Sequence, residues 1–333
     1  MSALSIISSW QKNIFKPIYW LEGEEEFFID EIMYYAEKRI LSEEEASFNM
    51  TTFYGKDANW ADIINACRRY PMFAEKQVVV LKEAQQMRDL DKLEPYIEKP
   101  LKSTIFVVSY KGKTVDGRSK LAKTIKSNGV IFTSKKIYDN KLPEWANGYV
   151  QSKGFQISPK ALTLLVDHLG NDLSRITNEI DKLSINISSA KNITEDDIEK
   201  YIGVSKEYNL FELQHAVSKK DFSKAIRIFQ FFDANPKAVP YVLILPSLYG
   251  YFTKIMTVSQ MPDKSENVLR PFFYNNPFLV PQALDTLRNY SFKQLEFTIL
   301  LLHDYNLKMI GINNATSSFG SMMKEMTYKI MTA

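Results

Sequence analysis

Apolar residues form short continuous runs in the first part of the chain and helical spacings in the rest. Four runs, almost entirely apolar, are typical of buried strands and lie at 18–21, 78–81, 105–108 and 129–132. Helical patterns separate them, as at Ile29, Ile32, Met33, Ala36 and Ile40, where apolar residues fall at i, i+3 and i+4. Continuous apolar strands that alternate with helices predict a mostly parallel sheet covered on both faces.

From about residue 141 the strand pattern ends and helix signals follow one another. Ser158 and Pro159 form an N-cap and first-turn pair, and Gly170 ends the helix that they begin. Thr194 and Asp197 have the spacing of a capping box. Longer amphipathic patterns cover 213–232 and 239–258, and another helix begins at 291. We therefore expect an α/β domain at 1–140, a small helical domain at 141–208 and a helical C-terminal domain at 209–333.

The composition is that of a globular protein, with 45% hydrophobic and 24% charged residues in 333. A formal net charge of +3 gives no overall basic field, so any contact with nucleic acid must depend on a local patch. Cys67 is the single cysteine, which excludes an internal disulfide framework. Residues 1–10 lack a signal-peptide pattern, and no run approaches the roughly 18 apolar residues of a membrane span. We expect a cytoplasmic protein without a membrane partner.

The turn after the first strand carries carboxylates where a nucleotide-binding fold places its phosphate loop. It contains Gly23 and four glutamates at positions 22, 24, 25 and 26, but no lysine. A phosphate loop needs several glycines and a Lys-Ser/Thr pair, so nucleotide hydrolysis is disfavoured. The glutamates form either a metal site or, more simply, a solvated helix N-terminus. His168, His215 and His303 are isolated, and we predict no catalytic, cofactor-binding or metal-binding residue.

A turn between a helix and the second apolar run places two apolar side chains together. The helix pattern ends at Tyr70 because Pro71 follows it, and Met72 and Phe73 come next, with Arg68, Arg69, Glu75 and Lys76 around them. If both side chains project, they make a compact plug for a hydrophobic pocket on another protein. The alternative is that they fold back onto their own sheet, and this stretch alone favours that alternative.

Basic residues gather in one segment of the chain. They are Lys111, Lys113, Arg118, Lys120, Lys123, Lys126, Lys135, Lys136 and Lys141. A helix from 118 to 127 would show Lys120, Lys123 and Lys126 along one side. Such a face either meets a phosphate backbone in a salt-sensitive way or is simply solvated, and the sequence leaves both interpretations open.

The order of these pieces resembles the delta subunit of the bacterial DNA polymerase III clamp loader. The matching stretches are YWLEGEE at 19–25, PMFAEKQVVV at 71–80, LGNDLSRI at 169–176, NEIDKL at 178–183 and NLFEL at 209–213. The pair of motifs between 169 and 183 is the most specific. The resemblance covers nearly the whole chain and weakens between about 258 and 290.

The resemblance implies a fold of class α/β plus all-α. The first domain would be an AAA+-like module with a degenerate phosphate loop, the second its helical lid, and the third a collar that joins the loader subunits. Met72 and Phe73 would enter a hydrophobic pocket of the sliding clamp (beta), beside Pro71, Arg68 and Arg69. Lys113, Arg118, Lys120 and Lys123 are candidate phosphate contacts.

The function that the resemblance implies is non-catalytic: binding the clamp and opening its ring for loading on primed DNA. ATP turnover would belong to neighbouring subunits, and any nucleotidyltransferase activity to the polymerase holoenzyme. The implied partners are the clamp, the gamma/tau and delta-prime subunits, and primed DNA, with no cofactor. The alternative function is a stand-alone scaffold that binds DNA without sequence specificity through the 111–141 segment.

Overall fold

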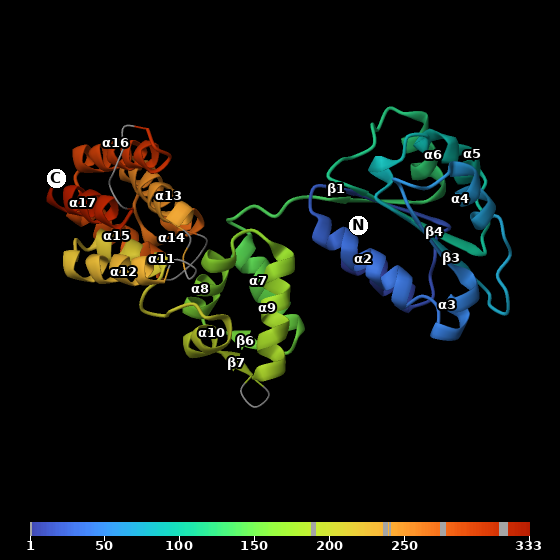
Figure 1. Cartoon of the computed structure of the whole chain (residues 1–333), viewed down its shortest axis with the longest axis horizontal. Helices are drawn as coiled ribbons and strands as arrows, with labels where there is room; N and C mark the ends of the chain where they lie inside the picture. Colours follow the sequence, from blue (N-terminus) through green and yellow to red (C-terminus); the bar gives the residue numbers. More distant parts are fainter. Residues whose placement is uncertain (1, 188–190, 236–238, 240, 274–277, 313–318) are drawn as a thin grey trace. The chain divides into compact units, whose positions relative to one another are not determined.

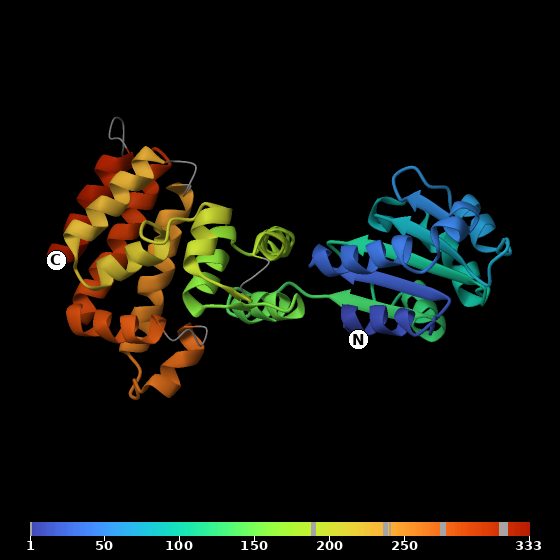
Figure 2. The same cartoon turned by 90° about the horizontal axis from the view of Figure 1, so that it is seen from below.

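The computed structural model describes residues 2–333 except 188–190, 236–238, 240, 274–277 and 313–318. The chain forms two compact units, Met1–Ile137 and Tyr138–Ala333 (Figures 1 and 2). The further division of the second unit into 141–208 and 209–333 stays a prediction.

The first unit alternates helices and strands, as its apolar runs predict. Its elements are α1 (Ala3–Gln11), β1 (Ile18–Gly23), α2 (Glu26–Lys38), α3 (Glu43–Asn49), β2 (Met50–Tyr54), α4 (Trp60–Cys67), β3 (Gln77–Lys82), η1 (Ala84–Gln86), η2 (Leu90–Leu93), α5 (Glu94–Glu98), β4 (Thr104–Lys111), α6 (Lys120–Asn128) and β5 (Val130–Ser134). The apolar residues Leu90, Leu93 and Ile97 have helical spacing, and they lie in a 3-10 turn followed by the short α5.

All five strands of the sheet are parallel, in the order β2-β3-β4-β1-β5. The four apolar runs became β1, β3, β4 and β5, so the parallel α/β prediction is confirmed. The sequence missed β2, where Thr51 and Thr52 interrupt the apolar pattern. As an edge strand, β2 keeps one side partly open to solvent and does not need a continuous apolar run.

Helices cover both faces of this sheet, which explains the continuous burial of its strands (Figure 1). On one face α1 and α2 pack through Ile6, Trp10 and Ile29 against alternate strand residues. On the other face α4, α5 and α6 pack against the intervening positions. The side-chain alternation along β1 shows this division, because Tyr19 belongs to the first core and Trp20 to the second.

The second unit is almost entirely helical. Its elements are α7 (Leu142–Ser152), β6 (Gln156–Ile157), α8 (Pro159–Leu169), α9 (Leu173–Asn186), β7 (Asn192–Ile193), α10 (Glu195–Ile202), α11 (Leu210–Ser218), α12 (Phe222–Ala234), α13 (Tyr241–Ser259), α14 (Glu266–Leu269), η3 (Arg270–Phe273), α15 (Leu279–Asn289), α16 (Phe292–Met309) and α17 (Phe319–Thr332). The expectation that strands disappear after 141 needs one correction, because β6 and β7 pair as a two-residue parallel ribbon.

The helix signals read from the sequence are confirmed, with one exception. Ser158 caps α8, and Thr194 and Asp197 form the capping box of α10. The pattern over 213–232, however, is two helices rather than one. Lys220 has a left-handed φ of 55° and the Asp221 side chain caps α12, so the chain turns between α11 and α12 although the apolar spacing continues.

One described helix corrects the expectation about membrane spans. Residues Val242–Ser259 of α13 are long and apolar enough to cross a membrane by length and composition alone. A core helix passes the same test, and α13 packs against α16 with Leu248, Phe252 and Ile255 buried in the core of the unit. The segment therefore gives only weak support for a membrane span.

Candidate functional site

The residues between α4 and β3, numbered 68–76, form a surface loop with no regular structure. The helix before it ends at Cys67, three residues earlier than the sequence pattern indicates. The reason is that Gln77, the first residue of β3, turns its buried side chain toward the end of α4. Its Nε2 lies 2.6 Å from the Arg69 carbonyl oxygen and 3.2 Å from that of Ala66. These carbonyls are therefore satisfied without another helical turn.

The middle of the 68–76 loop is attached to α3 by one buried side chain. Asn49, the last residue of α3, accepts a hydrogen bond from the Met72 backbone N–H at 2.7 Å through Oδ1. Its Nδ2 donates to the Met72 carbonyl oxygen at 2.9 Å. A single carboxamide thus satisfies both backbone groups of Met72, across a separation of 23 residues in the sequence.

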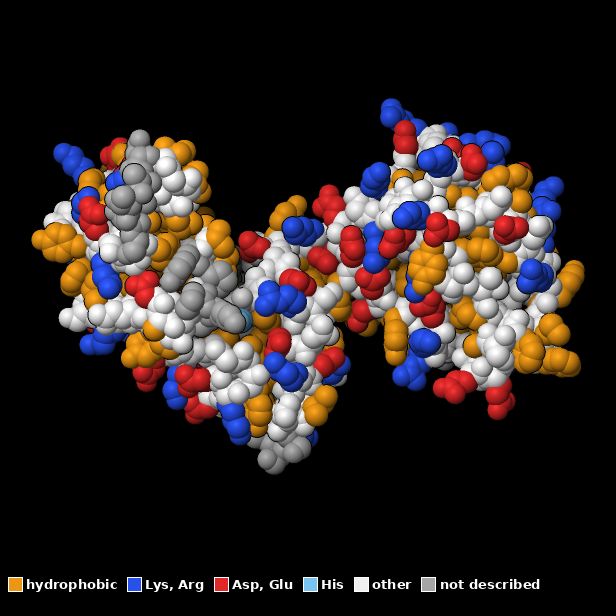
Figure 3. Space-filling view, viewed as in Figure 1, with side chains coloured by type: hydrophobic (Ala, Val, Ile, Leu, Met, Phe, Trp, Pro, Cys, Tyr) orange, Lys and Arg blue, Asp and Glu red, His pale blue; other side chains and the backbone are white. Residues whose placement is uncertain are grey.

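The loop presents its apolar side chains to solvent. Met72 is 53% exposed and Phe73 is 94% exposed. The two side chains therefore do not both fold back onto the sheet, and that interpretation is wrong. Phe73 also has a left-handed φ of 55°, which is rare for a bulky residue and is found mostly at strained functional positions. Arg68, Arg69 and Tyr70 are exposed as well, and Pro71 is half-buried. Figure 3 shows hydrophobic side chains projecting from the outer edge of this unit.

Two backbone donors of the turn after β1 are already engaged. The Gly23 N–H donates to the Lys113 carbonyl oxygen at 2.9 Å, and the Glu24 N–H donates to that of Ser134 at 3.1 Å. A phosphate loop uses backbone amides at this position to hold a nucleotide. Because the segment after β4 and the end of β5 already occupy these two amides, they do not serve a phosphate.

The glutamates of this turn do not gather into a cation site. Glu22 is buried, and its carboxylate accepts hydrogen bonds from Trp20 Nε1, Val115 N–H and Thr133 Oγ1. Glu25 instead caps α2 by accepting from the Phe27 N–H. Among the described residues no group of three His, Cys, Asp or Glu side chains is placed to hold a metal ion.

A cleft of about 330 Å³ lies at the carboxyl ends of β3 and β4, beside α2. Lys82 and Lys111 line it, and both are paired with carboxylates of α2. Lys82 lies 2.7 Å from Glu37, and Lys111 lies 2.7 Å from Asp30. The two cations are therefore already neutralised by the protein, and the cleft does not offer them to an anionic ligand.

Ion pairs divide the predicted basic segment. Lys120 contacts Glu94 at 2.7 Å and Arg118 contacts Asp116 at 3.2 Å. Lys113 and Lys123 are exposed and have no carboxylate partner within the described ranges, and the same holds for Lys126, Lys135 and Lys136. The structure thus brings the candidate phosphate contacts to the surface but leaves only part of their charge unpaired.

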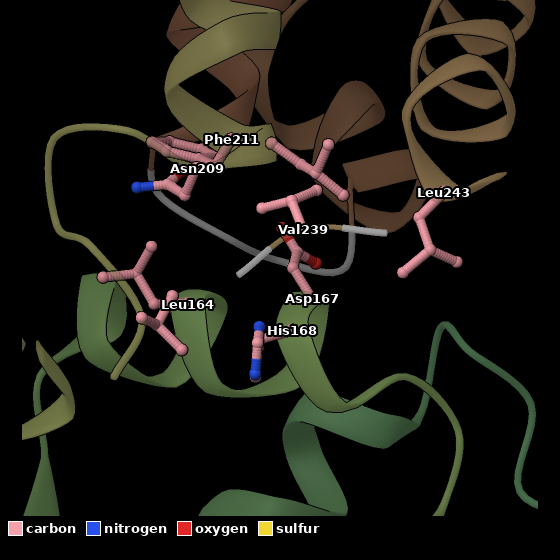
Figure 4. A pocket seen from close by; sticks show the side chains of 9 residues that line it. Leu164, Asp167, His168, Asn209, Phe211, Val239 and Leu243 are labelled. Carbon is pink, nitrogen blue, oxygen red and sulfur yellow. The ribbon is translucent and has the colours of Figure 1, made fainter. Parts of the chain in front are cut away.

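The second unit contains a small apolar pocket between α8, α11 and the start of α13 (Figure 4). Leu164, Phe211 and Leu243 contribute to its lining, and its volume of about 20 Å³ has room for roughly one water molecule. His168 also faces it, and burial, helped by nearby Arg175, lowers the pKa of the imidazole. A neutral histidine in so small a pocket gives no catalytic arrangement.

These features define a class of protein. Its α/β unit has the parallel sheet of a nucleotide-binding domain, but the protein's own carbonyl oxygens engage backbone amides of the turn after β1. An apolar loop is exposed on this unit, and a helical unit follows it. A family model for the DNA polymerase III delta subunit matches residues 19–135. DNA polymerase III subunit delta of Bacillus subtilis is 23% identical over 314 residues, which cover 90% of each chain. The probable DNA polymerase III subunit delta of Aquifex aeolicus is 23% identical over 321 residues, covering 89% of this chain and 88% of the relative.

The solved structure of the Bacillus subtilis DNA clamp loader delta protein has the same fold. It matches with a TM-score of 0.57 and 21% identity, over 99% of this chain and all of that chain. The chain is thus similar to DNA polymerase III delta subunits over nearly its whole length, and the family model matches its first unit. The predicted fold, a parallel-sheet α/β domain followed by helices, is confirmed.

Sequence reasoning missed the two residues that hold the exposed loop, Asn49 and Gln77. An asparagine at a helix end and a glutamine at a strand start are common, and neither gives a local signal of a distant partner. The polar Gln77 at the head of an apolar strand was the one available hint, because a buried amide must find hydrogen-bond partners.

Proposed function

We propose that this chain is a non-catalytic delta subunit that binds the ring-shaped sliding clamp and opens it for loading on primed DNA. The observation that carries the proposal is the 68–76 loop, in which Met72 and Phe73 are exposed while the buried Asn49 side chain binds the Met72 backbone. Apolar side chains exposed in this way gain free energy only when a partner covers them. Pro71, Arg68 and Arg69 border the same surface and would contact the rim of the pocket.

The occupied turn after β1 supports the non-catalytic part of the proposal. With the Gly23 and Glu24 amides engaged, ATP turnover in the assembled loader belongs to other subunits. The partners are then the gamma/tau and delta-prime subunits and the clamp, in the cytoplasm. Ring opening requires that the chain bind the open ring more tightly than the closed one.

The proposed collar has its own exposed apolar side chains, which would meet neighbouring subunits. Val242 and Tyr249 on α13, Leu300 on α16 and Tyr328 on α17 are all more than 40% exposed. The three helices lie in the 209–333 region, and apolar side chains exposed there are suited to contacts between subunits.

The test is clamp binding by a Met72→Ala/Phe73→Ala variant. Burying each side chain is worth roughly 1.5–3 kcal/mol, so we expect affinity for the cognate clamp to fall by at least about 100-fold. The matched control is Leu4→Ala/Ile14→Ala, because Leu4 is 74% and Ile14 is 59% exposed in the same unit. An equal loss in both variants, or none in the first, would refute the proposal.

A second candidate function is sequence-independent DNA binding, supported by the unpaired Lys113, Lys123 and Lys126. It predicts that the purified chain alone binds primed DNA, with an affinity that falls steeply as salt rises. Lys123→Gln/Lys126→Gln would reduce that salt slope. Binding by the chain that does not change with salt or with this variant contradicts the second candidate.

A further inference from the structure

We infer that Asn49 is the positioning residue for the 68–76 loop and sets how tightly the chain binds its partner. The inference rests on the proposed function, because it concerns the same loop. Asn49 does not itself reach the exposed surface, since its side chain is buried under the loop. Any effect on binding must therefore pass through Met72 and Phe73.

The hydrogen bonds of the loop make Asn49 its central attachment. Among residues 70–76, Met72 has the only backbone N–H with an acceptor in the part of the chain that the structure describes, and that acceptor is Asn49 Oδ1. The carboxamide is itself held in place, because Nδ2 also lies 3.1 Å from the Glu45 carbonyl oxygen one turn back in α3. The middle of the loop is thus fixed to a helix end.

The next residue explains why such an attachment is needed. Phe73 has a left-handed backbone, which costs free energy for a side chain of its size and persists only when the surroundings enforce it. The Asn49 bonds fix both peptide groups of Met72, immediately before that position. Without them the loop can relax to an ordinary backbone, and the Phe73 ring then points elsewhere for part of the time.

This gives a quantitative expectation. If the loop without its anchor holds the binding conformation for about one tenth of the time, apparent affinity falls about tenfold. Most of the loss should be in the association rate, because the contacts made after binding are unchanged. Asn49→Ala removes both bonds, whereas Asn49→Asp keeps the acceptor for the Met72 N–H but turns a buried carboxylate oxygen toward the Met72 and Glu45 carbonyl oxygens, so its affinity should fall at least as far.

The experiment measures binding of full-length variants to the cognate clamp, together with hydrogen exchange at the Met72 amide. Asn49→Ala should bind about tenfold more weakly and lose protection at that amide, and Asn49→Asp should bind at least as weakly as Asn49→Ala. Asn128→Ala is the matched control, because it removes an asparagine bond to the Glu98 carbonyl oxygen in the same unit and should bind like the unmodified chain. Circular dichroism at the assay temperature checks that each variant is folded.

A Phe73→Ala background gives a second test that does not depend on absolute affinity. If Asn49 acts through Phe73, the combined loss is smaller than the product of the two single losses. Full additivity, or a normal association rate in Asn49→Ala, would overturn the inference even if Met72→Ala/Phe73→Ala abolishes binding. If that double variant binds normally, the proposed function fails instead, so the two failures are distinguishable.

Discussion

The buried carboxylate of Glu212 gives the most quantitative prediction about stability. Glu212 lies on α11, with only 11% of its side chain exposed, and contacts Lys224 of α12 at 2.5 Å and Lys160 of α8 at 3.3 Å. The three residues therefore join the predicted 141–208 and 209–333 regions within one unit. Glu212→Gln leaves two partly buried ammonium groups without their counter-charge. A charge-assisted hydrogen bond in such a setting contributes roughly 1.5–3 kcal/mol, so we expect a loss of about 2 kcal/mol.

The measurement is calorimetric melting, with the transition of the second unit identified by hydrogen exchange in α11. For a unit of this size, 2 kcal/mol corresponds to a decrease in Tm of about 4–8 °C. Glu325→Gln is the matched control, because Glu325 pairs with Lys329 at 2.6 Å on α17 but is 56% exposed. An exposed pair one helical turn apart contributes about 0.3–0.5 kcal/mol, so its Tm should fall by no more than about 2 °C. Equal effects from the two variants would refute the argument from burial.

The same carboxylate predicts how stability changes with pH. Burial opposes ionisation of Glu212, but Lys224 and Lys160 outweigh it and hold its pKa below the ordinary value of 4.5. Because the pKa is lower in the folded state, the stabilisation is present in full above the pKa of the unfolded chain and is lost as pH falls through that of the folded chain. The difference in Tm between the unmodified chain and Glu212→Gln should therefore shrink only below about pH 4.5. A difference that stays constant down to pH 3 would contradict this assignment.

Three further predictions concern the first unit. Gly23→Ala should destabilise it by more than about 2 kcal/mol in urea unfolding, because Gly23 has φ +124° and an added Cβ would lie 2.0 Å from the Ser134 carbonyl oxygen; an unchanged midpoint would contradict this. Burial raises the pKa of the Cys67 thiol, so a thiol reagent should label it only after unfolding, and rapid labelling of the native chain would be the opposing result. Gln77→Ala should lower the free energy of unfolding by about 1–3 kcal/mol, because it leaves the Arg69 carbonyl oxygen without its donor; an equal effect of Gln11→Ala on the exposed end of α1 would argue against it.

Much of the fold was predictable because its signals are local. Three of the four apolar runs became the central strands β1, β3 and β4, since a strand buried on both faces needs apolar residues at every position, and the fourth became the edge strand β5. The capping residues Ser158 and Thr194 marked helix starts, because a cap acts within three residues of its partner. The edge strand β2 was missed because Thr51 and Thr52 interrupt its apolar run, and the break at Lys220 was missed because the apolar spacing continues across it.

The candidate site was predictable only in part. The pairing of Met72 with Phe73 at a turn was visible in the sequence, but their exposure was not, and the sequence alone favoured burial. The unpaired charge on Lys123, in contrast to Lys120, depends on whether a carboxylate such as Glu94 comes near. Such pairings follow from how helices stack on the sheet, which residue types alone do not specify.

The sequence by itself determined the strands with continuous apolar runs, the helix caps, the lack of phosphate-loop residues and the presence of an apolar pair beside a proline. Each of these depends on residues within one or two turns of one another. Only the tertiary structure decided that Asn49 holds Met72 from 23 residues away and that the segment after β4 and the end of β5 occupy the Gly23 and Glu24 amides. Hydrogen bonds between distant segments require a particular topology and register, and these form only when the whole parallel sheet assembles.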